Sequence, residues 1–477
     1  MKTARIMILI AVAVALLAVV PPFLSPNLVN AAIKMLIAAL FALAFTLAMG
    51  QAGMLSFGHA AYYGLGAFAA LHLMRAVEFK LIGFPTPLIP LGGAVVGFVF
   101  GMIFGWFATQ RTGVYFSMVT LALAELLFTL TPTWNSIFGN ESGIATIRGA
   151  SWGISFGSDI HVYYLTLVWS LLSAWCMWAF TQTPLGRLAL ALRDNEHRVR
   201  FLGFNTHIAR TLIFALSCMF TGIAGSLMAI ANESANYTIF GAQSSSSVVL
   251  QTFIGGAGTF FGPALGAAVM TFFARVTSDL TRSWLLYQGL IFVLIMLFAP
   301  DGIGGLISTH ARKLRPDGWK HLLGPYALCL AVGVLLVAGV IFTVESIHVV
   351  MSDAYLAKRT AAKGAWVPYP LFGTLFDPVS VFTWAIPVLL VGLGGLLLMP
   401  ATKITTAAWL AATTGDTPPP PRADHVPFSP HSAASPAPVA ASPSPAASAR
   451  GQQGTAPGTA IDEAHVPVLS LDRRGTA

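Results

Sequence analysis

The chain has 477 residues, of which 56% are hydrophobic and only 9% are charged, and its formal net charge is +8. Soluble domains carry about 25% charged residues, so the composition excludes a chain made mainly of globular domains and indicates a polytopic membrane protein. The basic residues lie between and after the apolar runs rather than on one aromatic-rich face, which favours membrane topology over nucleic-acid binding. The three cysteines lie singly in apolar segments, so we expect neither a disulfide nor a metal site.

Apolar runs near 20 residues, the length that crosses a bilayer, recur along the chain. The first, over 6–24, follows Lys2 and Arg5 and is interpreted as a retained helix, with a signal peptide cleaved near residues 30–32 as the alternative. The further predicted spans are 31–49, 54–74, 88–109, 113–131, 160–181, 211–232, 284–300, 324–347 and 379–400. The predicted fold class is therefore all-α, a polytopic helical bundle in a membrane.

The segment GQAGMLSFGHA at 50–60 is dense in glycine and other small residues. Glycine permits close backbone approach and helix interruption, which opens carbonyls and hydroxyls to a polar substrate. Close helix packing through small residues is the alternative explanation. The candidate pathway residues in this segment are Gly53, Ser56, Gly58 and His59. A lone histidine, however, is more often a satisfied core or interface residue than a substrate contact.

The predicted span after Arg111 has small or polar groups at helical spacing, a stripe that is typical of helix packing. Glu125 differs, because a carboxylate within a span is costly and usually faces a cavity or a partner group. Tyr115, Thr120 and Glu125 therefore join the candidate pathway, with a structural pairing to a neighbouring helix as the alternative for Glu125.

Residues 184–210 form a charged, helix-compatible island with five arginines and two acidic residues, which places the island on the cytoplasmic side. The stretch 188–202 has one apolar face, which predicts a short amphipathic helix that ends at Gly203 in the left-handed conformation. We expect this loop to contact a partner protein. The residues expected at that contact are Arg193, Asp194, Asn195, Glu196, Arg198, Gly203 and Phe204.

Small residues follow the loop in the span 211–232, where Gly222 pairs with Ser226 and Gly225 with Ala229 at a spacing of four. This spacing predicts close helix packing. A weak similarity also relates residues 52–60 to 257–264, which is explained equally well by an internal repeat and by chance between glycine-rich segments.

The apolar run 246–276 is too short for two spans and is interrupted by glycines. Two half-helices that meet at a glycine turn fit it better, and such breaks occur only where they are buried in protein or line a water-filled path. Gly255, Gly256 and Gly258 are therefore further pathway candidates. With this pair counted as re-entrant, both termini and the basic cluster at 312–320 lie in the cytoplasm.

From residue 411 the chain is rich in Pro, Ala and Ser without a periodic apolar face, which predicts disorder. The expected division is a transmembrane domain over 1–310, an extension with two further spans over 311–410, and a disordered tail over 411–477. The chain lacks the motifs GxxxxGK[ST], HExxH and GxSxG, so we expect no enzymatic activity and no cofactor in it. If ATP drives this protein, a different chain binds the nucleotide.

Six segments carry a resemblance to a known family: GQAGMLSFGHAAYYGLGAF (50–68), RTGVYFSMVTLALAELL (111–127), PLGRLALALRDNEHRVRFLGF (184–204), FTGIAGSLMA (220–229), IGGAGTFFGPALGA (254–267) and FAPDGIGGLI (298–307). In this order they resemble the LivM-type permease subunit of branched-chain amino acid ABC importers. The resemblance covers about residues 6–310. It implies an inner-membrane heteromer with a second, LivH-type permease, two cytoplasmic ATPase subunits that bind ATP and Mg²⁺, and a periplasmic substrate-binding protein.

The resemblance has departures. Importer families often show Glu-Ala-Ala shortly before the loop glycine, whereas Arg198 and Val199 hold the alanine positions here and Glu196 lies one place early. The family pattern also ends soon after residues 300–302, which leaves the extension unexplained except as an accessory anchor.

Other functions remain as alternatives. A permease of a urea or short-amide importer has the same segment order. An ion-coupled secondary transporter belongs to another class and would need several intramembrane ionisable residues, of which only Glu125 is clear. A membrane-embedded enzyme lacks any catalytic set in this sequence.

Overall fold

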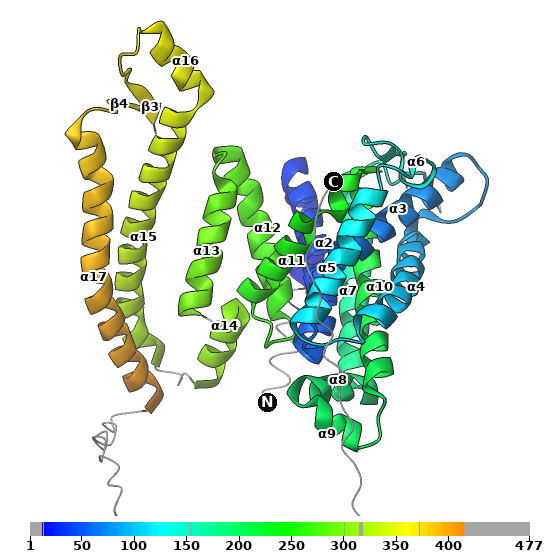
Figure 1. Ribbon diagram of the computed structural model, residues 1–477. Helices are drawn as coiled ribbons and strands as arrows, with labels where there is room; N and C mark the ends of the chain where they lie inside the picture. The colour runs from blue at the N-terminus through cyan, green and yellow to red at the C-terminus, as the bar shows by residue number, and fades with distance from the viewer. Residues whose placement is uncertain are drawn as a thin grey trace, which may run out of the picture. The chain divides into compact units, whose positions relative to one another are not determined.

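Helices make up most of the chain in the computed structural model, which describes residues 12, 14–151, 153, 155–299, 301–313, 318–371 and 373–414 (Figure 1). Up to the charged loop the helices are α2 (Pro26–Thr46), α3 (His59–Glu78), α4 (Pro90–Ala108), α5 (Val114–Leu130), α6 (Asn135–Phe138), α7 (Asp159–Gln182), α8 (Pro184–Asp194) and α9 (Glu196–Phe201). The later helices are α10 (Thr206–Asn232), α11 (Ala242–Gly255), α12 (Gly262–Leu280), α13 (Trp284–Phe298), α14 (Gly302–Lys313), α15 (Gly318–Met351), α16 (Asp353–Ala361) and α17 (Val381–Thr414).

Short elements occupy the connections. The antiparallel strand pairs are β1 (Ile144–Ala145) with β2 (Ser234–Ala235) and β3 (Tyr369–Leu371) with β4 (Thr374–Phe376). The short helical turns are η1 (Pro21–Phe23), the π-helical η2 (Leu47–Gln51), η3 (Thr86–Leu88) and η4 (Tyr237–Phe240).

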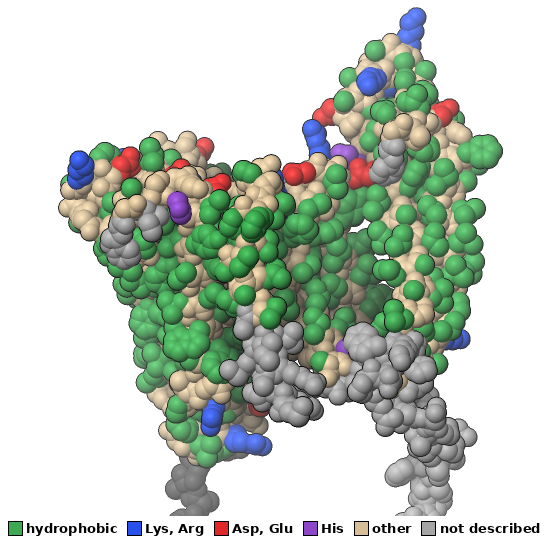
Figure 2. Space-filling model, turned by 180° about the vertical axis from the view of Figure 1, so that it is seen from behind, with side chains coloured by type: hydrophobic (Ala, Val, Ile, Leu, Met, Phe, Trp, Pro, Cys, Tyr) green, Lys and Arg blue, Asp and Glu red, His purple; other side chains and the backbone are tan. Residues whose placement is uncertain are grey.

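Six of the described helices are long and apolar enough to cross a membrane, or seven if the bent pair α13 and α14 counts as one span. In Figure 2, hydrophobic side chains cover the flanks of the helices and charged side chains gather near their ends. This distribution matches a bilayer, in which charged groups lie at the two water interfaces. The fold is thus the polytopic helical membrane bundle that the sequence predicts.

Two of the expected boundaries differ notably from the structure. The helix expected over 54–74 begins only at His59, since the chain is irregular from Gly53, where φ is +70°, to Gly58. The last helix, α17, continues to Thr414, past the boundary expected at residue 411. The rest of the expected disordered tail, and most of the span expected over 6–24, lie outside the described residues. Residues 30–32, the alternative cleavage site, lie inside α2.

Helix α10 is the centre of the bundle and packs between α3 and α4. In the most apolar stretch of α10, 83% of the residues are buried, whereas only 17% are buried in the corresponding stretches of α15 and α17. The close approach depends on glycines: a Cβ added at Gly222 would lie 2.1 Å from the Gly93 oxygen, and one added at Gly66 would lie 2.2 Å from the Gly222 oxygen. The packing role predicted for the small residues of α10 is therefore confirmed.

The expected break in the run 246–276 is present, since α11 and α12 are two helices joined by a turn at Gly256, where φ is +97°. The turn is packed backbone to backbone. A Cβ added at Gly255 would lie 2.2 Å from the Gly262 oxygen, and one added at Gly256 would lie 2.2 Å from the Asp301 oxygen. Any residue with a Cβ at these positions would push the segments apart, so the glycines are required for the turn.

An ion-pair cluster fastens the connection between α6 and α7 to the end of α10. The backbone N–H and Nε of Arg148 both donate to Glu233 Oε1 at 2.9 Å, and Arg148 Nη2 lies 3.7 Å from Asp159 Oδ1. Partial burial favours the neutral carboxyl, but the hydrogen bonds and charge of Arg148 outweigh it and hold the pKa of Glu233 below its ordinary value.

This cluster should make stability depend on pH. Because the pKa of Glu233 is lowered by folding, its carboxylate stabilises the protein above the unfolded pKa of about 4.3, and this contribution is lost as pH falls through the lowered value. We expect Glu233→Gln to lower the melting temperature at pH 7, and the difference from wild type to shrink below about pH 4. Glu141→Gln, at an exposed position, is the control. A difference that stays constant down to pH 3 would contradict the assignment.

Candidate coupling loop and translocation segments

The charged loop after α7 folds into two short helices, so the single helix expected over 188–202 is wrong. Thr183 Oγ1 accepts a hydrogen bond from the Gly186 N–H and begins α8. Asn195 is extended, with φ −161° and ψ 101°, and its Oδ1 accepts from the Arg198 N–H at 3.0 Å. An asparagine side chain satisfies a free N–H at a helix start, so Asn195 ends α8 and begins α9.

Salt bridges and apolar contacts tie these two helices to the bundle. Glu196 accepts two hydrogen bonds of 2.8 Å from Arg210, which is largely buried, and lies 3.5 Å from Arg200. Leu192 and Val199 are buried beneath the helices. Glu196 therefore points inward and anchors the loop instead of presenting its charge to a partner.

An apolar tip, formed by Phe201, Leu202 and Phe204, projects from the end of α9. Phe201 is 91% exposed and Leu202 is 71% exposed. Gly203 lies between Leu202 and Phe204 with φ +86°, the left-handed conformation that the sequence predicts. Phe204 was expected at the contact from the sequence, whereas Phe201 was not, and Leu202 was assigned to the apolar packing face over 188–202. Three apolar residues around a chain-reversing glycine are nevertheless a readable signal. Asp194 and Arg198 are also exposed.

Arg193 connects the charged loop to the interrupted segment between α2 and α3, which comprises η2 and the irregular residues up to Gly58 and is called the break below. Its Nη1 donates to the Gly50 carbonyl, and its side chain lies so close to Gly53 that an added Cβ there would be 2.9 Å from Arg193 Cγ. Carbonyls at the end of a helix lack intrahelical donors and attract cations, which explains the contact with Gly50 in η2. The Arg193 guanidinium thus reaches the Gly50 carbonyl although 43% of the side chain is exposed, whereas Phe201 and Leu202 at the apolar tip are much more exposed.

The irregular segment between α2 and α3 is closely packed. Ser56 is buried, and its Oγ accepts from the Gly58 N–H at 3.2 Å. A Cβ added at Gly58 would lie 2.3 Å from the oxygen of Thr120, which is itself buried. Ser245 Oγ on α11 accepts from the Ala60 N–H at 3.1 Å. These contacts hold the start of α3 against α5 and α11.

His59 lies in the core of the bundle among aromatic rings. Its Nε2 is 2.8 Å from Ser217 Oγ, and the Ser217 hydroxyl donates to the Ala44 carbonyl at 2.7 Å. Since the serine proton is used by Ala44, His59 Nε2–H is the donor to Ser217. Phe45 and Phe214 pack edge-on against the imidazole at 5.0 and 5.5 Å between centroids. The structure therefore brings His59 into a packed network.

The exposed candidates lie on α5. Tyr115 is 71% exposed, and Glu125 is partly exposed on the same helix, with Met118, Leu121 and Leu126 also uncovered. Within the described residues, the Glu125 carboxylate receives no hydrogen bond or ion pair. Helix α5 is apolar but shorter than the candidate spans, and an uncovered face of it that carries an unpaired carboxylate is suited to a neighbouring subunit or an aqueous path.

The glycine turn lies beside the break after α2. A Cβ added at Gly50 would lie 3.1 Å from the Ala257 oxygen, so the two interrupted segments touch. Gly255 and Gly256 are enclosed by backbone, whereas an added Cβ at Gly258 would meet nothing within 4 Å. The structure thus joins Arg193, the break and the turn at one place, which the sequence did not predict.

A recess between α2 and α11 was not predicted from the sequence. It has a volume of about 260 Å³, and its polar lining residues are Lys34, Gln243, Ser244, Ser247 and Gln251. Lys34 lies within the span formed by α2 and η2, where an ionisable side chain usually marks a functional position. The signal was readable, because Lys34 interrupts an apolar run.

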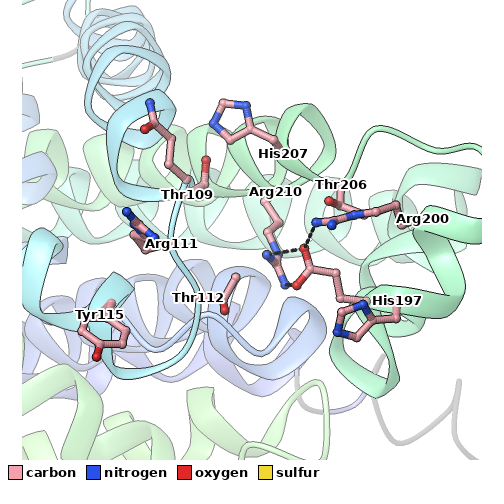
Figure 3. Close-up of a pocket in the computed structure, with 11 residues that line it drawn as sticks. Thr109, Arg111, Thr112, Tyr115, His197, Arg200, Thr206, His207 and Arg210 are labelled. Atoms are coloured by element: carbon pink, nitrogen blue, oxygen red, sulfur yellow. Dashed lines mark hydrogen bonds and ion pairs between the residues drawn. The ribbon is translucent and has the colours of Figure 1, made fainter. Parts of the chain in front are cut away.

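A larger cavity lies beside α9. Its volume is about 570 Å³, and Figure 3 shows that arginine and histidine side chains from α9, α10 and the connection between α4 and α5 converge on it. Among the described residues, no group of His, Cys, Asp and Glu side chains is arranged to hold a metal ion.

The interrupted helices, the membrane-spanning bundle and the charged loop that contacts the break define a membrane permease. The family model described as the permease component of branched-chain amino acid transport systems matches residues 27–300, and the chain belongs to this family. No solved structure gives a significant match.

Curated relatives agree with this family. The chain is 27% identical over 317 residues to the high-affinity branched-chain amino acid transport system permease protein LivM of Escherichia coli, which covers 61% of this chain and 73% of that protein. It is 23% identical over 286 residues to the corresponding permease protein BraD of Pseudomonas aeruginosa, covering 56% of this chain and 91% of that protein. The ribose import permease protein RbsC of Haemophilus influenzae is 22% identical over 250 residues, a match that covers 50% of this chain and 74% of that protein.

Proposed function

We propose that the chain is a permease subunit of an ATP-driven importer and that it carries branched-chain amino acids. The observation that supports coupling to ATP most directly is the apolar tip on a loop that also contacts the break between α2 and α3 through Arg193. Large exposed apolar residues in a charged loop are suited to a protein partner. A movement of that partner would be transmitted to the interrupted segments.

The proposed assembly contains this chain, a second LivH-type permease, two ATPase subunits and a periplasmic binding protein. The excess of arginine in the loop supports a cytoplasmic position for α8 and α9 and hence for both termini. The apolar tip would occupy a groove on one ATPase, with the exposed Arg198 and Asp194 at the rim of that contact.

The proposed translocation path runs along the uncovered face of α5, between this chain and the second permease. The exposure of Tyr115 and Glu125 supports this position. The other pathway candidates would serve it indirectly, since Ser56, Gly58, His59 and Thr120 hold the break against α5. Gly53 and the glycines of the turn would permit the interrupted segments to move relative to each other.

The substrate assignment rests on the relatives named for branched-chain amino acids. The ribose permease supports a sugar importer as the second candidate, at lower identity. Uptake assays on the assembled complex separate these functions. We expect ATP-dependent leucine uptake that excess urea and ribose do not inhibit. Uptake by the purified single chain driven by a sodium or proton gradient would instead support a secondary transporter.

The apolar tip is tested by Phe201→Ser. Removal of a central, exposed aromatic anchor from an interface costs about 2 kcal/mol or more, so ATPase co-purification should fall by roughly 30-fold. Phe79→Ser, at an exposed position after α3, is the matched control and should leave the complex intact. Both variants should insert and melt as wild type does. Unchanged ATPase binding in Phe201→Ser would remove the tip from the coupling contact.

A further inference from the structure

The cavity beside α9 carries an excess of positive charge. Its lining includes three guanidinium groups, from Arg111, Arg200 and Arg210, and a single carboxylate, from Glu196. Two salt bridges, from Arg210 and Arg200, already occupy that carboxylate. Arg111 lies across the cavity from Arg200 in Figure 3, and within the described residues its guanidinium makes no hydrogen bond or ion pair.

Several donors in this cavity lack acceptors. Arg210 is 9% exposed, and its Nε is buried without a hydrogen-bond partner among the described residues. The hydroxyls of Thr112 and Tyr115 and the imidazole of His197 line the same space. His207, in contrast, is already bonded through Nε2 to the Trp106 carbonyl at 2.9 Å. A buried donor without an acceptor is costly, so the arrangement is suited to an anion that has several acceptor oxygens.

The cavity lies at a membrane boundary. Two candidate spans, Thr86–Ala108 and Thr206–Asn232, have one end beside it. Trp106, Phe107 and Ile208, which are close in the chain to the lining residues Thr109 and His207, expose large apolar surfaces. Phosphate groups of a bilayer lie just beyond the ends of the spans, and basic pockets between helix ends bind anionic headgroups.

We propose that this basic cavity binds a phosphate group, supplied either by an anionic phospholipid headgroup or by free phosphate. The exposed apolar residues beside it are suited to acyl chains, which favours the phospholipid. A phosphate seated between α9 and the connection of α4 and α5 would fix the charged loop against the bundle. The proposal does not depend on which substrate the permease carries.

The test uses the full-length chain in vesicles of phosphatidylcholine with or without phosphatidylglycerol. Arg111→Gln with Arg200→Gln removes two positive charges from the cavity and leaves the Arg210–Glu196 pair intact. Each basic side chain contributes about fivefold to the attraction of an anionic headgroup, so phosphatidylglycerol binding should weaken by roughly 30-fold. Lys80→Gln with Arg282→Gln removes the same charge elsewhere and should leave binding near the wild-type value.

A second arm distinguishes the two sources of phosphate. If inorganic phosphate in detergent raises the melting temperature of wild type but not of the cavity variant, free phosphate is the ligand. If only phosphatidylglycerol raises the melting temperature of wild type and not that of the cavity variant, the ligand is the lipid. Equal stabilisation of wild type and cavity variant by both probes would overturn the proposal. So would a cavity variant that loses ATPase co-purification with unchanged lipid and phosphate binding, since the cavity would then be a protein docking surface.

Discussion

Gly222→Val should prevent the bundle from packing. A Cβ at this position would lie 2.1 Å from the Gly93 oxygen, which belongs to the backbone of α4. A backbone atom cannot rotate away as a side chain does, so α4 would have to move off the central helix. Overpacking of this kind lowers the free energy of unfolding by about 3 kcal/mol or more. We expect little monodisperse protein after extraction and a lowered melting temperature in what remains.

The control for this variant is Gly289→Val on α13, where an added Cβ would meet nothing within 4 Å. Both substitutions add the same apolar volume to a membrane helix, so they differ in packing alone. Gly289→Val should behave as wild type in size-exclusion chromatography and thermal unfolding. Equal stability of the two variants would mean that α4 and α10 do not approach as closely as the structure indicates.

Arg193→Gln should uncouple the permease without releasing the ATPase. The guanidinium is directed to the Gly50 carbonyl and away from the apolar tip, so its removal should leave the docking contact intact. A hydrogen bond from a charged donor contributes about 1.5 kcal/mol or more, and its loss should lower substrate-stimulated ATP hydrolysis and uptake by roughly tenfold. Arg193→Lys should restore part of this activity, because it keeps a cation near the helix end.

Arg187→Gln on the same helix is the matched control, since Arg187 is exposed. Its uptake and stimulated hydrolysis should equal those of wild type. The sequence alone predicted that Arg193 contacts the partner. That hypothesis would be supported instead if Arg193→Gln released the ATPase while the remaining complexes hydrolysed ATP normally.

Several features of this fold are local in sequence and were predictable for that reason. Hydropathy over about 20 residues identified most spans, and the arginine content identified the charged loop. The glycines at 255–262 indicated a break between two half-helices, and Gly203 indicated a left-handed residue. Each of these properties depends on a residue and its immediate neighbours, so no knowledge of distant contacts was needed.

Local patterns were misleading where two interpretations share one signal. The apolar face of 188–202 suited a single helix, but the Asn195 side chain caps a second helix start. The apolar run from residue 54 was compatible with a helix that includes Gly58, yet the chain is irregular up to Gly58 and α3 begins at His59. The repeated glycines Gly93, Gly97, Gly101 and Gly105 on α4 were overlooked, although their spacing of four indicates a packing face.

The sequence by itself determined a polytopic helical permease with a charged loop and interrupted helices, because hydropathy, charge and glycine content act over short stretches of chain. Only the tertiary structure decided that His59 lies in the core, that Arg193 bonds to Gly50, and that Glu196 is neutralised by Arg210. Each of these depends on which segments approach one another across 14 to 158 residues of chain. The glycine contacts among α3, α4 and α10 bring these segments together. The neighbours that a side chain then acquires determine whether it packs in the core, forms an ion pair or faces a partner.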